Sequence, residues 1–275
     1  MAIKDIVVYL DASESGNTAE EFALSLAAQT GAHVTAVGIS VKYLPFGMVQ
    51  DVSIYDAFTQ LTDESRAKIE AAYKKFDAAA PAGVQSELVV IEVPDQEANR
   101  RFGELGRHFD VSIVGQGTRF TQDVVNLMVQ GALFYSGKPL LIVPNNHKGP
   151  AKLGKAMVCW DGGVAAARAI AGALPLLCRA GKVEIVRVAE EGQTLEELPG
   201  FNIARHLARH GISATLKELP ATSDAAAAIL SYAAASNPDY MVMGGYGHWK
   251  LTEFVFGGMT RTILSSLPVP IFMAH

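Results

Sequence analysis

The feature that most constrains the fold of this chain is an internal duplication. Five landmarks occur twice in the same order, and the pairs are Asp11 with Asp161, Gly31 with Gly181, Gly83 with Gly211, Gly115 with Gly244, and Pro139 with Pro268. The offset is 150 residues for the first two pairs and 128 or 129 for the last three, so the first copy carries about 21 extra residues. We therefore expect two domains of one fold, residues 1–148 and 152–275, joined by a polar turn. The extra residues are expected to form a loop at 43–57 before a helix.

Each copy alternates short apolar runs with segments of helical spacing. A continuous apolar run of four to seven residues is typical of a strand that is buried on both faces. The expected strands are 6–10, 33–39, 84–92, 111–115 and 140–143 in the first copy, and 155–160, 183–188, 212–219, 240–244 and 269–273 in the second. Gly31, Gly181 and Asn237 stand where helices should end. This alternation predicts right-handed crossovers and a mostly parallel sheet in each copy.

Composition narrows the class of protein. The chain has 275 residues, of which 49% are hydrophobic and 19% charged, and this balance indicates a globular protein with a large core. The net charge of −5 argues against nucleic acid and anionic membranes as partners. No apolar run approaches the roughly 20 residues that span a bilayer, and the first residues do not resemble a secretory signal. Cys159 and Cys178 are the only cysteines and are expected to be buried, inert thiols, which suits a cytoplasmic protein.

A glycine-rich segment follows the fourth expected strand of the second copy. Open parallel sheets bind ligands beyond the carboxyl ends of their strands, and here Gly244, Gly247 and Gly257 occur just after that strand, before a helix. Glycines let the backbone approach an anion closely, and a helix N-terminus offers free N–H groups. Asp161, after the first strand of this copy, would accept from a ribose hydroxyl or hold a metal through water. The alternative interpretation of the glycines is a tight loop and close packing of helix on sheet.

The glycine spacing resembles the universal stress protein family, and the resemblance covers nearly the whole chain in two copies. The family pattern G-x2-G-x9-G-[ST] is matched by Gly244, Gly247 and Gly257, whereas Gly258 stands at the Ser/Thr position. The resemblance implies an α/β fold with two tandem flavodoxin-like domains of the adenine nucleotide alpha hydrolase-like type. Each would have a five-stranded parallel sheet of order 3-2-1-4-5, flanked by helices.

The resemblance also implies a ligand. It points to ATP or another adenine nucleotide in the C-terminal domain, with Mg²⁺ as its potential companion. Asp161 would lie near the nucleotide and the backbone of Val188 would read the adenine. The glycines at 244, 247, 257 and 258, together with Thr260, would surround the phosphates.

The first copy departs from the family pattern. Gly115 is present, but Thr118 and Met128 occupy the next two glycine positions, while Gly117 and Gly131 fall at the wrong intervals. Side chains there would obstruct a close backbone approach. We therefore expect a degenerate site in the first copy, with Asp11 accepting backbone N–H bonds at the start of the following helix.

Other groups of potentially functional residues are weaker evidence for a site. His206 and His210 are four residues apart in an expected helix, and a solvated helical face is favoured over a metal pair because arginines flank them. His248 could touch phosphate or simply face solvent. The sequence has no nucleophile elbow and no Walker A motif, so no catalytic residue and no metal ligand is assigned, and any ATP hydrolysis should be slow.

These observations lead to two functional hypotheses. The favoured one is a regulatory stress-response protein whose nucleotide occupancy alters the surface shown to a protein partner that the sequence does not identify. The competing one is a scaffold of the same fold that binds no nucleotide. The family also implies association through the last strand, so residues 140–143 and 269–273 could pair and make the chain an internal pseudo-dimer, with further homodimerisation left open.

Overall fold

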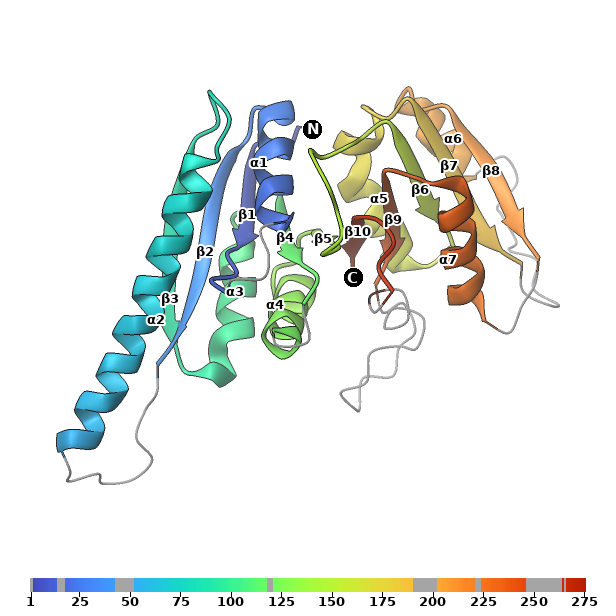
Figure 1. The fold of residues 1–275 in the computed structure, drawn as a ribbon. Coiled ribbons are helices and arrows are strands. Elements are labelled where there is room, and N and C mark those ends of the chain that lie inside the picture. The colour runs from blue at the N-terminus through green and yellow to red at the C-terminus, as the bar shows by residue number, and fades with distance from the viewer. Residues whose placement is uncertain are drawn as a thin grey trace. The chain divides into compact units, whose positions relative to one another are not determined.

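The structure of the chain is a computed structural model that describes residues 2–13, 18–42, 52–117, 121–189, 202–220, 224–245, 264 and 266–275 (Figure 1). The chain divides into two compact units. The N-terminal unit holds Ile3–Lys138 and Lys148–Ala151, and the C-terminal unit holds Pro139–His147 and Lys152–His275. The short segment before residue 152 is tied to the N-terminal unit because Ala151 N donates to Ser25 Oγ at 3.0 Å and Gln29 Nε2 donates to Ala151 O at 2.7 Å.

The N-terminal unit is a parallel sheet with helices on both faces. Its strands are β1 (Asp5–Tyr9), β2 (His33–Val41), β3 (Ser86–Val93) and β4 (Val111–Gly115), in the order β3-β2-β1-β4. Its helices are α1 (Thr18–Thr30), α2 (Val52–Ala78), the short η1 (Asp95–Glu97), α3 (Ala98–Gly106) and α4 (Gln122–Tyr135). Right-handed crossovers with this strand order place α1 and α2 on one face of the sheet and α3 and α4 on the other.

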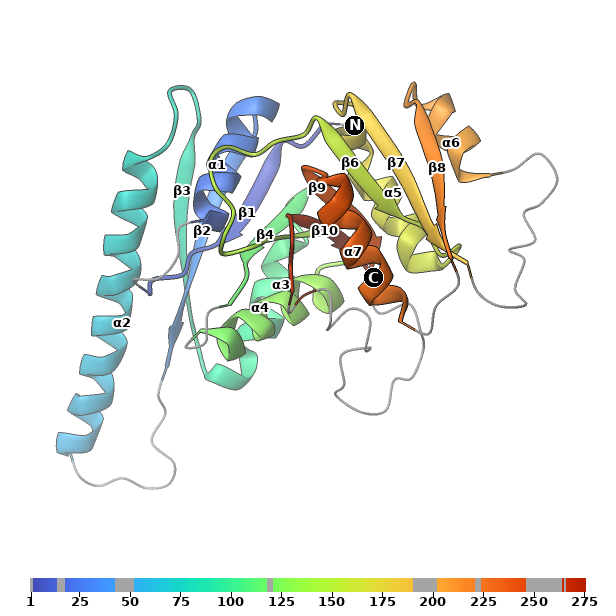
Figure 2. The same ribbon diagram turned by 45° about the vertical axis from the view of Figure 1, so that its right-hand side comes forward.

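The C-terminal unit repeats this strand order. Its strands are β6 (Lys155–Cys159), β7 (Lys182–Val188), β8 (Ala214–Leu219), β9 (Tyr240–Gly244) and β10 (Ile271–Ala274), in the order β8-β7-β6-β9-β10, all parallel. The described helices are α5 (Val164–Leu177), α6 (Ile203–Arg209) and α7 (Ala225–Ser236). Figure 2 shows α5 and α7 on opposite faces of this sheet.

Strand β5 (Leu140–Val143) belongs to the C-terminal unit although it closes the first copy in sequence. It pairs antiparallel with β10, with Ile142 opposite Ile271 and Leu140 opposite Met273. The predicted pairing of the two last strands is thereby confirmed. The wider pseudo-dimer remains a prediction.

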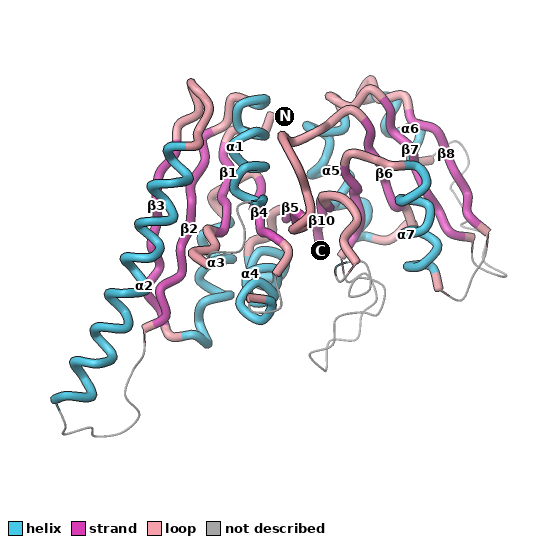
Figure 3. Tube along the Cα trace, in the orientation of Figure 1, coloured by secondary structure: helices cyan, strands magenta, loops and turns pink. Residues whose placement is uncertain are grey.

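The predicted strands are confirmed, because the ten observed strands begin and end within about two residues of the expected runs (Figure 3). Their burial explains why they could be read from the sequence. Ile6, Val7 and Val8 of β1 and Met241 and Val242 of β9 are fully buried. Residues that are covered by helices on both faces are apolar on both, so the strand reads as an unbroken run.

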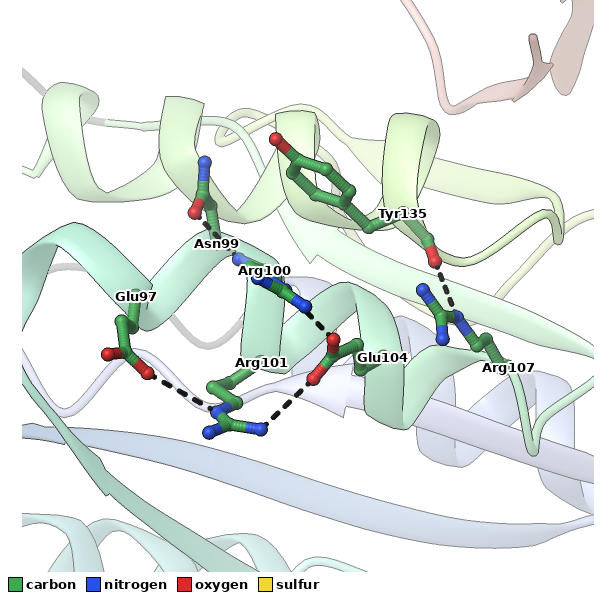
Figure 4. Close-up of polar contacts among 7 residues, drawn as sticks. All are labelled: Glu97, Asn99, Arg100, Arg101, Glu104, Arg107 and Tyr135. Carbon is green, nitrogen blue, oxygen red and sulfur yellow. Dashed lines mark hydrogen bonds and ion pairs between the residues drawn. The ribbon is translucent and has the colours of Figure 1, made fainter.

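Two glycines bring α3 and α4 into close contact. A Cβ on Gly103 would lie 2.2 Å from the Gly131 main-chain oxygen, and one on Gly131 would lie 2.1 Å from the Asn99 main-chain oxygen. Figure 4 shows this pair of helices, where Arg107 Nε donates to the Tyr135 main-chain oxygen at the end of α4. Gly131 therefore serves the close packing of α4 on α3.

On its exposed side α3 carries a small network of ion pairs. Arg101 bridges Glu97 and Glu104, and Arg100 also pairs with Glu104 at 2.9 Å (Figure 4). These arginines are more than half exposed, so each pair contributes at most about 1 kcal/mol.

Several local expectations are corrected. Helix α2 begins at Val52, inside the predicted loop at 43–57, so residues 52–57 of this loop are helical. Gly31 (φ +65°) and Asn237 (φ +49°) end helices as predicted, but α5 ends at Leu177 with Cys178 as its cap, so Gly181 does not cap it. The expectation of two buried thiols holds only for Cys159, because Cys178 is exposed.

Among the described residues, no helix is long and apolar enough to cross a bilayer.

Candidate functional site

The candidate site lies at the carboxyl edge of the C-terminal sheet. Strand β6 pairs with β7 on one side and with β9 on the other, with Met157 opposite both Glu184 and Met241. Because the strands are parallel, their carboxyl ends meet at one edge, where Asp161, Val188 and Gly244 follow or end them. In the order β8-β7-β6-β9-β10, this is the point at which the connections change direction, the usual ligand position in such sheets.

Asp161 is held by a tight turn. Its Oδ1 accepts from Gly163 N at 2.8 Å, and Gly162 between them adopts φ +76°, which a glycine reaches without strain. Gly163 is the residue that caps the start of α5. The Asp161 side chain is exposed, so an oriented carboxylate stands at this edge of the sheet and can accept from a ligand hydroxyl.

Val188 ends β7 beyond the last paired residue of β6. Successive residues of a strand direct their main-chain groups to opposite neighbours. Ala189 N donates to Leu219 O of β8, so the N–H and C=O of Val188 face the β6 side. On that side the pairing ends at Cys159 with Val186, and Trp160 N donates to Val186 O. This geometry suits main-chain groups that hydrogen-bond to a ligand. The resemblance implies this role for Val188.

Gly244 is explained by packing alone. A Cβ at this position would lie 2.5 Å from Ala166 N and 2.8 Å from the Ala165 carbonyl carbon, both main-chain atoms of α5. At the corresponding Gly115 a Cβ would be 3.4 Å from the Ala19 side chain, an ordinary contact. The alternative interpretation from the sequence, close packing of helix on sheet, thus accounts for this glycine.

The other predicted positions, Gly247, Gly257, Gly258 and Thr260, lie outside the described residues, and so does His248. The structure therefore brings together Asp161, Val188 and Gly244 of the predicted set.

The corresponding edge of the N-terminal unit is acidic. Asp11 makes the same turn as Asp161, its Oδ1 accepting from Ser13 N at 2.9 Å. It thus accepts a backbone N–H bond from Ser13, in the turn that follows β1. Glu20, in the first turn of α1, is 6% exposed, and its Oε1 accepts from Asp11 N at 3.2 Å. Burial, reinforced by the charges of Asp11 and Glu21, raises the pKa of Glu20 to about 8.

The contacts of Gly115 and Gly244 show which residues of α1 correspond to which residues of α5. Ala19 touches the Gly115 position as Ala165 touches the Gly244 position. Counting onward along each helix, Glu20 corresponds to Ala166 and Phe22 to Arg168. The C-terminal edge therefore has an arginine where the N-terminal edge has a buried phenylalanine, and an alanine where it has a buried acid. The degenerate site in the first copy stays a prediction.

Sequence reasoning missed Glu20, which is buried at the edge of the N-terminal unit. Glu20 gave no signal, because an acid in a first helical turn is ordinary and only the fold buries it.

The pair of histidines lies away from this edge. His206 is in α6 and His210 caps it, both are exposed, and their rings meet edge to face with centroids 4.9 Å apart. Cys178 Sγ donates to the His210 main-chain oxygen at 3.8 Å.

Burial raises the pKa of the Cys159 thiol to about 12, so this thiol stays protonated.

Comparison with known proteins places the fold. No protein-family model matches the sequence. No curated protein matches it either. Among solved structures, a universal stress protein from Archaeoglobus fulgidus DSM 4304 matches with a TM-score of 0.70 and 18% identity, over 98% of this chain and 95% of that chain. A functionally unknown protein from Pseudomonas aeruginosa PAO1 matches with a TM-score of 0.58 and 16% identity, over 98% and 92%. A universal stress protein in complex with cAMP matches 53% of this chain at 20% identity, with a TM-score of 0.35.

The first of these matches spans both units, and the observed strand order is the one that the resemblance implied. The chain therefore has the fold of the universal stress proteins over nearly its whole length.

Proposed function

We propose that the C-terminal unit binds ATP or a related adenine nucleotide, and that its occupancy regulates a protein partner. The observation that carries the proposal is the exposed, oriented carboxylate of Asp161 at the point where the strand order reverses, beside the end of β7. The segment that follows Gly244 supplies the glycine spacing for a phosphate loop. In this arrangement Asp161 accepts from the ribose, the Val188 backbone contacts the adenine, and Gly247, Gly257, Gly258 and Thr260 surround the phosphates.

The residues at this edge also fit a phosphate-bound Mg²⁺. Asp161 offers a hard oxygen donor, and Mg²⁺ is usually held by one or two carboxylates together with phosphates and water. When present, the ion would neutralise phosphate charge. The binding prediction below is therefore tested with and without Mg²⁺.

ATP is expected to stabilise the chain against unfolding. Ligand at 100 times its Kd adds about 2.7 kcal/mol to the unfolding free energy of the unit that binds it. Both tryptophans, Trp160 and Trp249, occur in the second copy, one directly before Asp161 and one between Gly247 and Gly257. Intrinsic fluorescence can therefore follow both the titration with ATP and the unfolding of this unit. Gly247→Val is expected to abolish the stabilisation.

The two aspartates provide a matched pair of variants. Asp161→Asn keeps the oxygen that accepts from Gly163 N but removes the charge, and we expect it to weaken ATP binding about tenfold. Asp11→Asn makes the same change in the same turn of the N-terminal unit and should leave the affinity unchanged. Equal affinities for wild type and Asp161→Asn would contradict the assignment of Asp161.

A scaffold that binds no nucleotide is the competing function, favoured by two observations. Packing against α5 already explains Gly244, and Gly258 lacks the hydroxyl of the family pattern. If saturating ATP changes neither the fluorescence nor the unfolding midpoint, the scaffold is the better description. Sustained phosphate release under saturating ATP would instead indicate a hydrolase.

A further inference from the structure

The two histidines of α6 form a pair of exposed imidazole rings. His206 lies within the helix and His210 caps its end, so the two are one turn apart on the same face. Their ring centroids are 4.9 Å apart at an interplanar angle of 69°. Within the described part of the chain, neither ring makes a hydrogen bond or an ion pair. Their ring nitrogens are therefore available to a ligand.

The separation of the rings is the one that a shared metal ion requires. A Zn–N bond to histidine is about 2.0–2.1 Å long, which puts the centre of a coordinated imidazole about 3.2 Å from the metal. Two rings bound at an angle of about 90–109° at the metal then have their centres about 4.5–5.2 Å apart. The observed 4.9 Å falls within this range.

The main chain that carries the two rings is anchored at both ends of the helix. At its start the Asn202 side chain accepts from Arg205 N at 2.7 Å. In its middle Leu207 is fully buried. At its end Cys178 Sγ donates to the His210 main-chain oxygen at 3.8 Å. Because the helix is already held in place, a metal ion has only two side chains to order, which lowers the cost of binding.

The arginines beside the histidines do not block the pair. Arg205 and Arg209 each precede a histidine by one residue, and neighbouring residues of a helix do not face each other. Both arginines are exposed, so water and salt screen their charges. They weaken the attraction of a cation but leave the helical face of the histidines open.

We infer that His206 and His210 together bind a divalent transition metal ion of the kind that prefers nitrogen ligands, such as Zn²⁺, Ni²⁺ or Cu²⁺. Imidazole suits these ions, whereas Mg²⁺ and Ca²⁺ prefer oxygen. Among the described residues, no group of three or more histidine, cysteine, aspartate and glutamate residues could hold a metal ion. The chain thus supplies two ligands and water completes the coordination. This site is separate from the nucleotide edge and does not depend on the proposed function.

The test titrates the full chain with Zn²⁺ by calorimetry, in the absence of nucleotide. His206→Gln and His210→Gln are each expected to weaken Zn²⁺ binding about tenfold or more, since even the loss of a group that only supports a metal ligand typically costs about 10–100-fold. Two control variants, His108→Gln and Cys178→Ser, should bind like the wild type. His108 is an exposed histidine of the N-terminal unit, and Cys178 is the exposed thiol beside α6.

Three results would overturn the inference. The pair is not the site if His206→Gln and His210→Gln bind Zn²⁺ as tightly as the wild type. The thiol is a ligand, and the assignment to two histidines is wrong, if Cys178→Ser loses as much affinity as His206→Gln. The inference also fails if the wild type does not bind Zn²⁺. The proposed function stands in all three cases, because ATP binding is measured separately. The unfolding midpoint without metal shows whether each variant is folded.

Discussion

Gly244→Ala is expected to destabilise the C-terminal unit by about 3 kcal/mol, near the upper end of what overpacking usually costs. The added Cβ would lie 2.5 Å from Ala166 N and 2.8 Å from the Ala165 carbonyl carbon. Both are main-chain atoms in the first turn of α5, so no side-chain rotation can relieve the clash. Helix and strand must move apart instead. Urea unfolding followed by tryptophan fluorescence measures this change, because both tryptophans belong to the second copy.

Gly115→Ala is the matched control, and its expected effect is of opposite sign. Here the Cβ would meet only the Ala19 side chain at 3.4 Å, and the φ of Gly115 is not positive. An alanine that fits a glycine position stabilises by about 0.4–1 kcal/mol by restricting the unfolded chain. Circular dichroism is the suitable probe, since this unit contains no tryptophan. Equal unfolding midpoints for Gly244→Ala and the wild type would refute the packing explanation.

This result determines how the nucleotide site should be probed. A variant at Gly244 would lose ATP binding simply because β9 and α5 no longer fit together. Loss of binding in Gly244→Ala would therefore say nothing about phosphate. Asp161 is the better probe, because its side chain is exposed and does not pack in the core.

The strands and their order could be predicted because their signal is local and repeated. Runs such as Val111–Gly115 and Tyr240–Gly244 are buried on both faces, and the two copies support each other's assignment. The end of α5 could not be predicted in the same way. Gly181 looked like a cap, but the helix ends at Leu177, after Pro175 in its last turn. Helix ends depend on where the chain must join the next strand, which one segment does not reveal.

The candidate site was less predictable than the fold, since its residues depend on tertiary contacts. Asp161 could be found because it ends a strand, whereas the reason for Gly244 lies in a helix about eighty residues earlier. Glu20 was recognised as buried only in the fold, where its Oε1 accepts from Asp11 N. Cys178 was expected to be buried, and the fold exposes it.

Glu20→Gln is expected to stabilise the chain at neutral and alkaline pH and to remove a pH dependence. Burial first, and the nearby charges of Asp11 and Glu21, raise the pKa of Glu20 from 4.5 to about 8 in the folded state. An acid whose pKa is raised by folding contributes its full stability below the unfolded pKa and loses it as pH rises through the folded pKa. Between pH 4.5 and 8 the folded state holds a proton that the unfolded state has released. The free energy of unfolding should therefore fall over this range by about 5 kcal/mol in the wild type.

Glutamine is neutral at every pH and keeps an oxygen that can accept from Asp11 N. The decrease of the unfolding free energy with rising pH should therefore be absent in Glu20→Gln. Glu21→Gln is the control, because Glu21 is the exposed neighbour on the same helix and should shift the stability by less than about 1 kcal/mol at every pH. Urea unfolding by circular dichroism at pH 6, 7, 8 and 9 separates the three proteins. Tyr9, Asp11 and Glu21 are the other ionisable groups coupled to this carboxyl, and all three remain in Glu20→Gln. A slope that persists in Glu20→Gln would therefore show that Glu20 is not the group that titrates. Its loss would show that the Glu20 carboxyl is protonated in the folded state at neutral pH.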